Sequence, residues 1–456
     1  MRVHEYVEFD AVGLRGLLAR GEVSAAEVEA AARTALEAAD ARVNGLALPL
    51  IERPLDYAAD GPLAGVPFLI KDSGPMAEGV PFFCGSRALE RVRARADSAM
   101  MQRFRAAGLA TLGLTTVPEL LINFCTESAR TGITRNPYDP GRGVGGSSGG
   151  AAALVASGAV PLAHANDGGG SIRIPASCCG LVGLKPTRGR TPSEQPDTSE
   201  FALTRSVRDA QALLGAASEA PGVLRVAVTT RAWNGAPVDA EVAAAALAVA
   251  RRLEALGHIV EEASPNVDWE VLLRATVAPV TVFTAAPFLA APIDESKLEA
   301  GSRRFLREAR ELRALELIAA FEAQRALTRE LDAFLARYDL LVTPTLAQLP
   351  AAHGALRYNA PGIRVRDWIE SLFAYGPFTK VFNTGGQPAI SLPLGASAGG
   401  LPIGVQLAAA RDRDALLLGV AAALEPYFVT KSASASWLRE SPMKGSASTE
   451  IAAPTR

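Results

Sequence analysis

Two glycine-rich loops, whose serines stand 24 residues apart, constrain the fold more than any other feature of this sequence. The first loop, residues 145–150, carries Ser147, and the second, Gly168-Gly169-Gly170, leads into Ser171. Between them, the pattern predicts a helix at residues 149–157 and a strand at 159–165. Glycine adds no side chain and tolerates unusual dihedral angles, so backbone can approach each serine closely. A helix and a returning strand could bring Ser147 beside Ser171.

The flanking segments alternate between helix and strand patterns. Helices are predicted at 10–19 and 24–40, at 99–107 and through most of 265–338; strands are predicted at 66–70, 109–114, 339–345, 389–393 and 404–408. This alternation is typical of an α/β layered fold.

No internal repeat and no interdomain linker interrupts the pattern. We therefore expect a single large domain over residues 1–430. It divides into N-terminal helices (1–60), a core (61–216), and the remaining sheet with substrate-covering helices (217–430). Residues 431–456 are rich in Ser and Ala and predict a mobile tail.

Composition excludes several classes of partner. The formal charge of the 456 residues is −2 and no basic stripe occurs, so nucleic acid and anionic membranes are not expected as partners. No signal-peptide pattern and no run of about 18 apolar residues occurs. Four cysteines without a repeated CxxC pattern suggest reduced thiols in the cytoplasm. The four histidines show no metal spacing, so we expect neither metal nor other cofactor, and we allow for a homodimer.

Two common motifs match the first loop by letter only. Residues 141–146 fit the dinucleotide fingerprint, but turn residues 136–140 stand where that motif needs a strand. Residues 145–149 fit the nucleophile elbow of α/β-hydrolases, and so do residues 395–399, which shows how common that pattern is. We favour neither interpretation.

Lys71 is the candidate base. The chain has only six lysines against forty arginines, and Lys71 ends the apolar run 66–70. Strand alternation sends Asp72 to the opposite face, so the two need not pair. Burial can lower a lysine pKa by up to about 3–5 units, and a neutral lysine can deprotonate a serine. The alternative is a strand-end lysine that is exposed or paired with Asp72.

Together these segments resemble the amidase signature family. The resemblance runs from about residue 61 to 216, with its most diagnostic stretch from Ser171 to Thr187, and returns at 339–345, 383–391 and 400–406. It implies a central mixed β-sheet covered by helices on both faces. It also implies hydrolysis of a carboxylic amide, outside peptide bonds, through an acyl-enzyme.

The resemblance also implies residue roles. Lys71 would be the general base, Ser147 a bridging serine next to a cis peptide, and Ser171 the nucleophile. The oxyanion would be held by the N–H groups of Gly168, Gly169, Gly170 and Ser171.

Further positions are expected to support this site. Asp167 and Arg173 would brace the second loop, and Ser148 would support the hydrogen-bond network. The chain departs from the family at residues 166–171, where many members read Thr-Asp-Thr-Gly-Gly-Ser and this chain reads Asn-Asp-Gly-Gly-Gly-Ser.

The predicted pocket residues are Cys125, Thr126, Phe373 and Tyr375. The first two stand where the family lines its pocket, and the aromatic pair suggests an apolar or aromatic acyl group. We expect the helices within 281–327 and the loop 359–378 to cover the acyl side. The small-molecule substrate would be an apolar, aromatic, or cyclic or linear oligoamide.

Other functions remain open at this point. The chain could be the amidase component of a tRNA-dependent amidotransferase, although those proteins typically have Gln where this chain has Ile174. An esterase and a non-catalytic binding protein are further alternatives. Cleavage of simple amides by the purified chain alone would favour an independent amidase.

Overall fold

The computed structural model describes residues 1–429, with gaps at 75, 91, 217–218 and 290–292. The predicted C-terminal tail, residues 431–456, lies outside the described residues.

The described elements follow the expected alternation. The strands are β1 (Pro67–Lys71), β2 (Ala110–Thr115), β3 (Glu127–Ser128), β4 (Gly132–Ile133), β5 (Leu162–Asp167), β6 (Val182–Lys185), β7 (Ser199–Thr204), β8 (Arg225–Val228), β9 (Ile259–Glu262), β10 (Leu340–Pro344), β11 (Ala389–Ala396) and β12 (Pro402–Ala408). The α-helices are α1 (Val3–Tyr6), α2 (Ala11–Ala19), α3 (Ala25–Val43), α4 (Ala99–Ala106), α5 (Gly149–Ala156), α6 (Arg173–Cys179), α7 (Val207–Leu214), α8 (Ala240–Ala255), α9 (Trp269–Leu289), α10 (Ala300–Glu311), α11 (Ala314–Leu335), α12 (Val365–Tyr375), α13 (Lys380–Gly385) and α14 (Asp414–Leu424).

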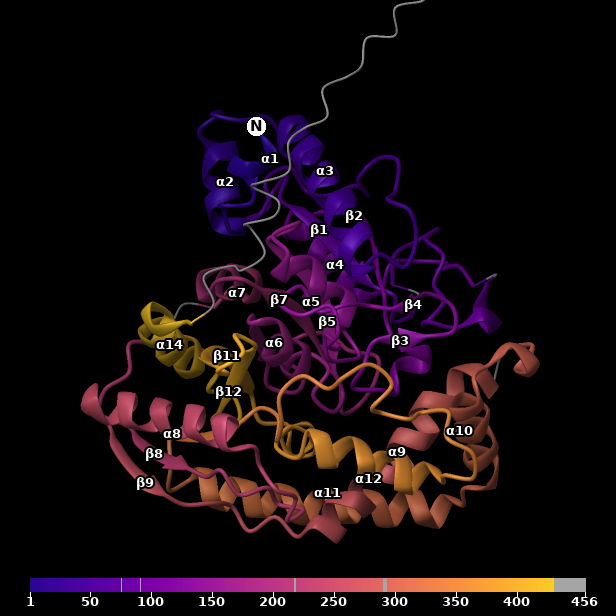
Figure 1. Cartoon of the computed structure of the whole chain (residues 1–456), viewed down its shortest axis with the longest axis vertical. Helices are drawn as coiled ribbons and strands as arrows, with labels where there is room; N and C mark the ends of the chain where they lie inside the picture. The colour runs from indigo at the N-terminus through magenta and orange to yellow at the C-terminus, as the bar shows by residue number, and fades with distance from the viewer. Residues whose placement is uncertain (75, 91, 217–218, 290–292, 430–456) are drawn as a thin grey trace, which may run out of the picture.

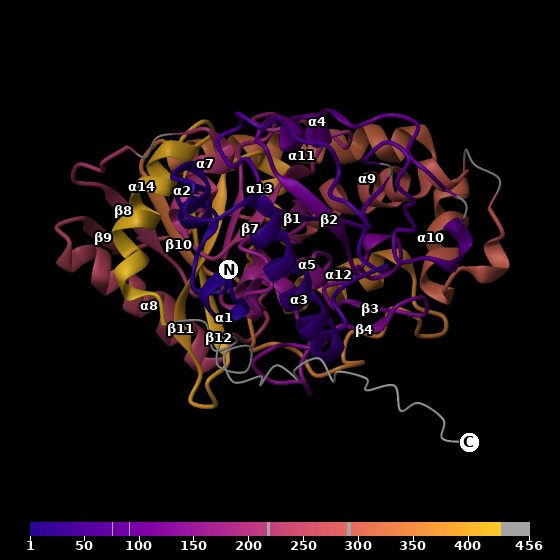
Figure 2. The same ribbon diagram turned by 90° about the horizontal axis from the view of Figure 1, so that it is seen from above.

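Eight of the strands form one mixed sheet, in the order β5-β7-β6-β11-β12-β10-β8-β9. Its β10-β8 and β8-β9 pairs are parallel and its other pairs are antiparallel. At one end of the sheet β8 and β9 lie beside α8, whereas α9 and α10 lie at the opposite end of the molecule (Figures 1 and 2). The expected α/β fold with a central mixed sheet is confirmed.

Two glycines show how helices cover both faces of the sheet. A Cβ on Gly395 would lie 2.6 Å from Ala245 of α8, and a Cβ on Gly404 would lie 2.5 Å from Ser177 of α6. Gly395 pairs with Ile403 across the β11-β12 ladder, so those two residues share a face and Gly404 is on the other. Helices α8 and α6 therefore pack on opposite faces, at positions where only glycine fits.

Local sequence signals determine the N-terminal helices. Asp10 caps α2 by accepting the N–H of Gly13, and Ser24 forms the predicted capping box with Glu27 at the start of α3. Helix α3 runs three residues past its predicted end at 40. It ends where Asn44 adopts the left-handed conformation, a common helix stop.

Strand β5 begins later and ends later than predicted. It runs through Asn166 and Asp167 because both continue the antiparallel ladder with β7, where Asn166 stands opposite Glu200. The alternation of side chains then places His164 and Asn166 on one face and Asp167 on the other. The predicted loop at 166–170 is therefore shorter by two residues.

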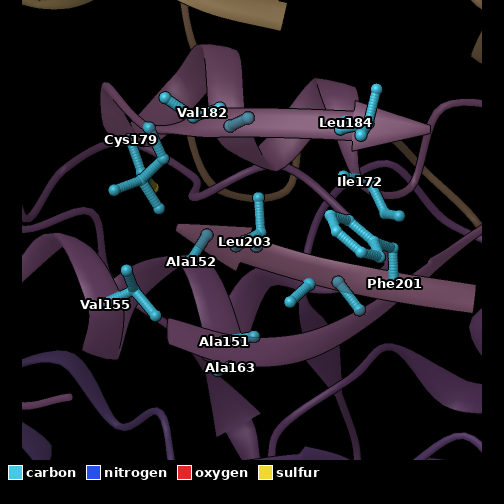
Figure 3. Close-up of a cluster of buried hydrophobic side chains, with 14 of the residues drawn as sticks. Ala151, Ala152, Val155, Ala163, Ile172, Cys179, Val182, Leu184, Phe201 and Leu203 are labelled. Atoms are coloured by element: carbon cyan, nitrogen blue, oxygen red, sulfur yellow. The ribbon is translucent and has the colours of Figure 1, made fainter. Parts of the chain in front are cut away.

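The interior between α5, α6 and the strands β5, β6 and β7 is packed with small and branched side chains (Figure 3). Ala152 and Val155 of α5, Cys179 of α6 and Leu203 of β7 are buried there. Helix α5 begins directly after the loop that carries Ser147, and α6 begins shortly after Ser171. Burial of these apolar side chains therefore fixes the two loops relative to each other.

Helix α9 has the length and composition of a membrane-crossing helix, and it is the one described helix that does. In its most apolar window 44% of the residues are buried, and core helices of soluble proteins satisfy the same criterion. Several of its apolar side chains line the internal cavity described below, which accounts for much of this apolar character.

Candidate active site

Lys71 lies at the end of β1, fully buried, with its amine among three oxygen atoms. Its Nζ is 2.8 Å from Ser147 Oγ, 2.9 Å from Ser148 Oγ and 2.6 Å from Asn166 Oδ1. Burial lowers the pKa of Lys71 to about 7, against the opposing charges of Glu200, Asp167 and Cys84. A substantial fraction of the amine is therefore neutral near neutral pH.

The alternative of a solvent-exposed or Asp72-paired lysine is wrong. Asp72 is buried on the other side of the strand end, and its carboxylate accepts the backbone N–H groups of Phe83, Cys84 and Gly85. The predicted alternation of the two side chains holds.

The loop carrying Ser147 is packed too tightly for larger residues. The Gly146–Ser147 peptide bond is cis, as the family resemblance implies. A Cβ on Gly149 would lie 2.1 Å from Thr126 Oγ1, and Thr126 donates its hydroxyl to Gly145 O at 2.9 Å. Thr126 thus supports the loop from behind.

The loop carrying Ser171 has its carbonyl groups tied down on one side. The oxygens of Asp167, Gly168, Gly169 and Gly170 accept hydrogen bonds from Asn383 Nδ2 (2.7 Å), Lys380 Nζ (2.9 Å), Thr379 Oγ1 (2.6 Å) and Ile174 N (2.7 Å) respectively. In a trans peptide the N–H points away from the preceding carbonyl, so the N–H groups of residues 168–171 face the opposite side.

One predicted oxyanion donor is wrong. The N–H of Gly170 already donates to Asp167 Oδ1 at 2.7 Å, so it is occupied. The N–H groups of Gly168, Gly169 and Ser171 have no acceptor among the described residues. These three form the available donor set.

Asp167 and Arg173 are both fully buried and form a two-point ion pair, with distances of 2.9 Å (Nε–Oδ2) and 2.8 Å (Nη2–Oδ1). Burial acts to raise the pKa of Asp167, but the guanidinium and Asn383 hold it well below its usual range. The remaining guanidinium donors reach Thr379 O, Asn383 Oδ1 and Gln406 Oε1. This cluster joins the nucleophile loop to α13 and β12.

A cavity of about 700 Å³ opens onto both serines. Ser147 and Ser171 both line it, and no hydrogen bond joins their two hydroxyls in the described part of the chain. One wall is apolar, with Met76, Phe124, Val280, Phe283, Phe288 and Phe373 among its residues. The opposite wall is polar and includes Glu194, Asp197, Thr198 and Glu200.

Three of the four predicted pocket residues do not line this cavity. Thr126 supports the first loop, Cys125 is buried beside it, and the Tyr375 hydroxyl accepts the N–H of Ala351 and lies 3.7 Å from Cys178 Sγ. Only Phe373 is in the wall, with its ring centroid 5.6 Å from that of Phe124. Helices α9 and α12 cover the cavity where the acyl-side cover was expected.

Sequence reasoning missed five residues that hold the site: Asn166, Glu200, Thr379, Lys380 and Asn383. A signal existed for Lys380, one of six lysines, which is buried and pairs with Asp197 at 2.6 Å. Among the described residues, no cluster of three His, Cys, Asp or Glu side chains could hold a metal ion.

Comparison with known proteins gives consistent matches. A family model described as Amidase matches residues 14–219 and 194–418. The chain is 36% identical over 466 residues to 6-aminohexanoate-cyclic-dimer hydrolase of Paenarthrobacter ureafaciens, covering 91% of this chain and 94% of that relative. A structure of 6-aminohexanoate cyclic dimer hydrolase with substrate matches with a TM-score of 0.86 and 33% identity, covering 96% and 99% of the two chains. A bacterial aryl acylamidase structure matches with a TM-score of 0.80 and 25% identity, covering 94% and 97%.

These matches, together with the fold, define a hydrolase that acts on carbon–nitrogen bonds of amides. More specifically, the chain belongs to the amidase family, whose signature the sequence resembles.

Proposed function

We propose that this amidase cleaves its substrate through an acyl-enzyme on Ser171, with Lys71 and Ser147 as the proton relay. The observation that carries the proposal is the buried Lys71 amine, whose Nζ lies 2.8 Å from Ser147 Oγ at the floor of the cavity. Arginine could not serve there, because it stays protonated in proteins, whereas lysine can be neutral.

In the proposed reaction, neutral Lys71 accepts a proton from Ser147, which accepts one from Ser171. The Ser171 oxygen attacks the amide carbonyl, and the N–H groups of Gly168, Gly169 and Ser171 hold the oxyanion. The proton returns through Ser147 to the leaving amine, and water then hydrolyses the acyl-enzyme. The relay requires the Ser171 hydroxyl to turn to Ser147 when substrate binds, since catalytic hydrogen bonds often tighten only in the complex.

The substrate we propose is an apolar, aromatic, or cyclic or linear oligoamide. The apolar wall with its three phenylalanines from α9 and α12 supports a hydrophobic acyl portion. The similarity to 6-aminohexanoate-cyclic-dimer hydrolase adds support for an oligoamide.

The amidotransferase alternative is less well supported. A structure of the glutamyl-tRNA(Gln) amidotransferase from Thermotoga maritima matches with a TM-score of 0.70 and 25% identity, lower than the values for the cyclic dimer hydrolase. We propose a cytoplasmic location, because all four cysteines are buried and unpaired.

The nucleophile can be tested against a serine that matches the same simple motif. Ser171→Ala should lower turnover by at least about 10³-fold, because the acyl-enzyme cannot form. Ser397→Ala is the control, because Ser397 lies in the turn between β11 and β12 and its hydroxyl accepts the N–H of Leu401. Equal activity of the two variants would exclude Ser171 as the nucleophile.

An amide panel varying acyl length and aromaticity tests the substrate class. We expect kcat/KM to rise with apolar acyl size up to the capacity of the cavity, and Phe373→Ala to reduce the preference for aromatic acyl groups. Equal rates across the panel would contradict an apolar acyl subsite while leaving the relay intact.

A further inference from the structure

Behind the Lys71 amine, four groups from three strands form a closed ring of hydrogen bonds. The Lys71 main-chain N–H donates to His164 Nδ1 at 3.1 Å, and His164 Nε2 lies 2.7 Å from Glu200 Oε2. Asn166 Nδ2 donates to Glu200 Oε1 at 3.2 Å, and Lys71 Nζ closes the ring at Asn166 Oδ1, 2.6 Å away. The register of β5 and β7, which sets Asn166 opposite Glu200, makes this ring possible.

The chemistry of these groups fixes every donor and acceptor. A main-chain N–H can only donate, so His164 Nδ1 is unprotonated and Nε2 carries the proton that it gives to Glu200. The Glu200 carboxylate can only accept, so the Asn166 NH₂ must face it. The amide carbonyl of Asn166 therefore faces Lys71, since a flipped amide would set two oxygen atoms against each other.

This arrangement determines how a neutral Lys71 amine is oriented. A neutral amine has two N–H donors and one lone pair. One N–H must point to Asn166 Oδ1, an acceptor only. The second points to Ser148 Oγ, whose own proton can reach Asn166 O at 3.4 Å. The lone pair is left for the third neighbour, Ser147.

We propose that Asn166, held by Glu200 and His164, is the positioning residue that aims the lone pair of Lys71 at Ser147. The inference rests on the proposed relay and adds a reason for the Asn that replaces the Thr found at this position in many family members. Glu200 also lines the cavity, so the ring joins the polar wall to the base.

The charges around Lys71 make the ring testable by pH. Burial is the main cause of the lowered Lys71 pKa, and Glu200 is the first of the charges that oppose it. Of the other two, Asp167 is neutralised by Arg173, and burial raises the pKa of the Cys84 thiol so that it stays protonated. His164 is held neutral by the ring. Of the described charges that act on Lys71, Glu200 is therefore the one that no cation neutralises.

The test compares the pH profile of kcat/KM in two variants that should move in opposite directions. Glu200→Gln removes the opposing charge and should shift the acid limb to lower pH. Asn166→Asp puts a carboxylate beside Nζ and should shift it to higher pH. Asn166→Ala should lower kcat by about 10-fold or more, with a smaller change in KM. Glu262→Gln, on the exposed edge strand β9, is the charge control.

The outcomes separate this inference from the proposed function. If both acid limbs coincide with that of the unmodified enzyme while Lys71→Arg is inactive, the ring has no positioning role and only this inference fails. If Lys71→Arg remains active, the relay itself fails and the inference with it. Thermal unfolding of each variant identifies any loss of activity caused by misfolding.

Discussion

Two buried lysines in this chain share one electrostatic property and differ in everything that chemistry requires. Burial lowers the pKa of both Lys71 and Lys185 to about 7. Lys71 Nζ contacts two serine hydroxyls beside the cavity, whereas the hydrogen bond found for Lys185 Nζ goes to the carbonyl of Pro186, away from the cavity wall. A lowered pKa makes a lysine able to act as a base, but contact with a nucleophile relay decides whether it does.

The largest expected difference is in turnover. Lys71→Arg should reduce kcat/KM by at least about 10³-fold, because the guanidinium keeps its proton at every accessible pH. Lys185→Arg should keep kcat/KM within about tenfold of the unmodified enzyme whenever the protein folds. Comparable losses in both variants, at matched folded fractions, would erase the distinction between the two lysines.

The next difference is in the pH dependence of the rate. Because Lys71 must be neutral to accept a proton, kcat/KM should rise about tenfold per pH unit below pH 7 and level off above it. Lys185→Met should leave this acid limb in place. An acid limb that moves in Lys185→Met would assign the kinetic pKa to the wrong lysine.

The smallest difference is in stability. The unfolded chain keeps these lysines protonated up to about pH 10.4, whereas the folded chain releases the protons near pH 7. The unfolded state thus binds more protons above pH 7, so the free energy of unfolding should rise with pH, by up to about 1.4 kcal/mol per unit for each lysine.

Denaturant unfolding between pH 7 and about 8, below the ordinary titration of thiols, measures this slope. Lys185→Met should flatten it relative to the unmodified protein. An unchanged slope in Lys185→Met would show that Lys185 does not change its protonation on folding.

Much of the fold was predictable because local patterns carry it. The capping box at Ser24, the apolar run before Lys71 and the two glycine loops each correspond to observed elements. The error at β5 arose because Asn166 and Asp167 look like loop residues locally, while pairing with the distant strand β7 makes them strand.

The site was predictable at its centre and not at its edges. Lys71, Ser147 and Ser171 sit on segments whose sequences are unusual by themselves. The availability of the Gly170 N–H depends instead on where the Asp167 side chain points, and the walls of the cavity depend on how α9 and α12 pack. Cys125, Thr126 and Tyr375 were misplaced for the same reason, since their neighbours come from distant parts of the chain.

The most direct measurement is an NMR titration of the lysine side chains, which is practical because the chain has only six lysines. With ¹³C at the lysine Cε, the resonance that disappears in Lys71→Arg identifies the base, and Lys185→Met assigns the other buried lysine. The account predicts that the Lys71 resonance titrates with a midpoint near 7 and that this midpoint matches the acid limb of kcat/KM. A Lys71 resonance that stays protonated to about pH 10, in an enzyme fully active at pH 8, would contradict it.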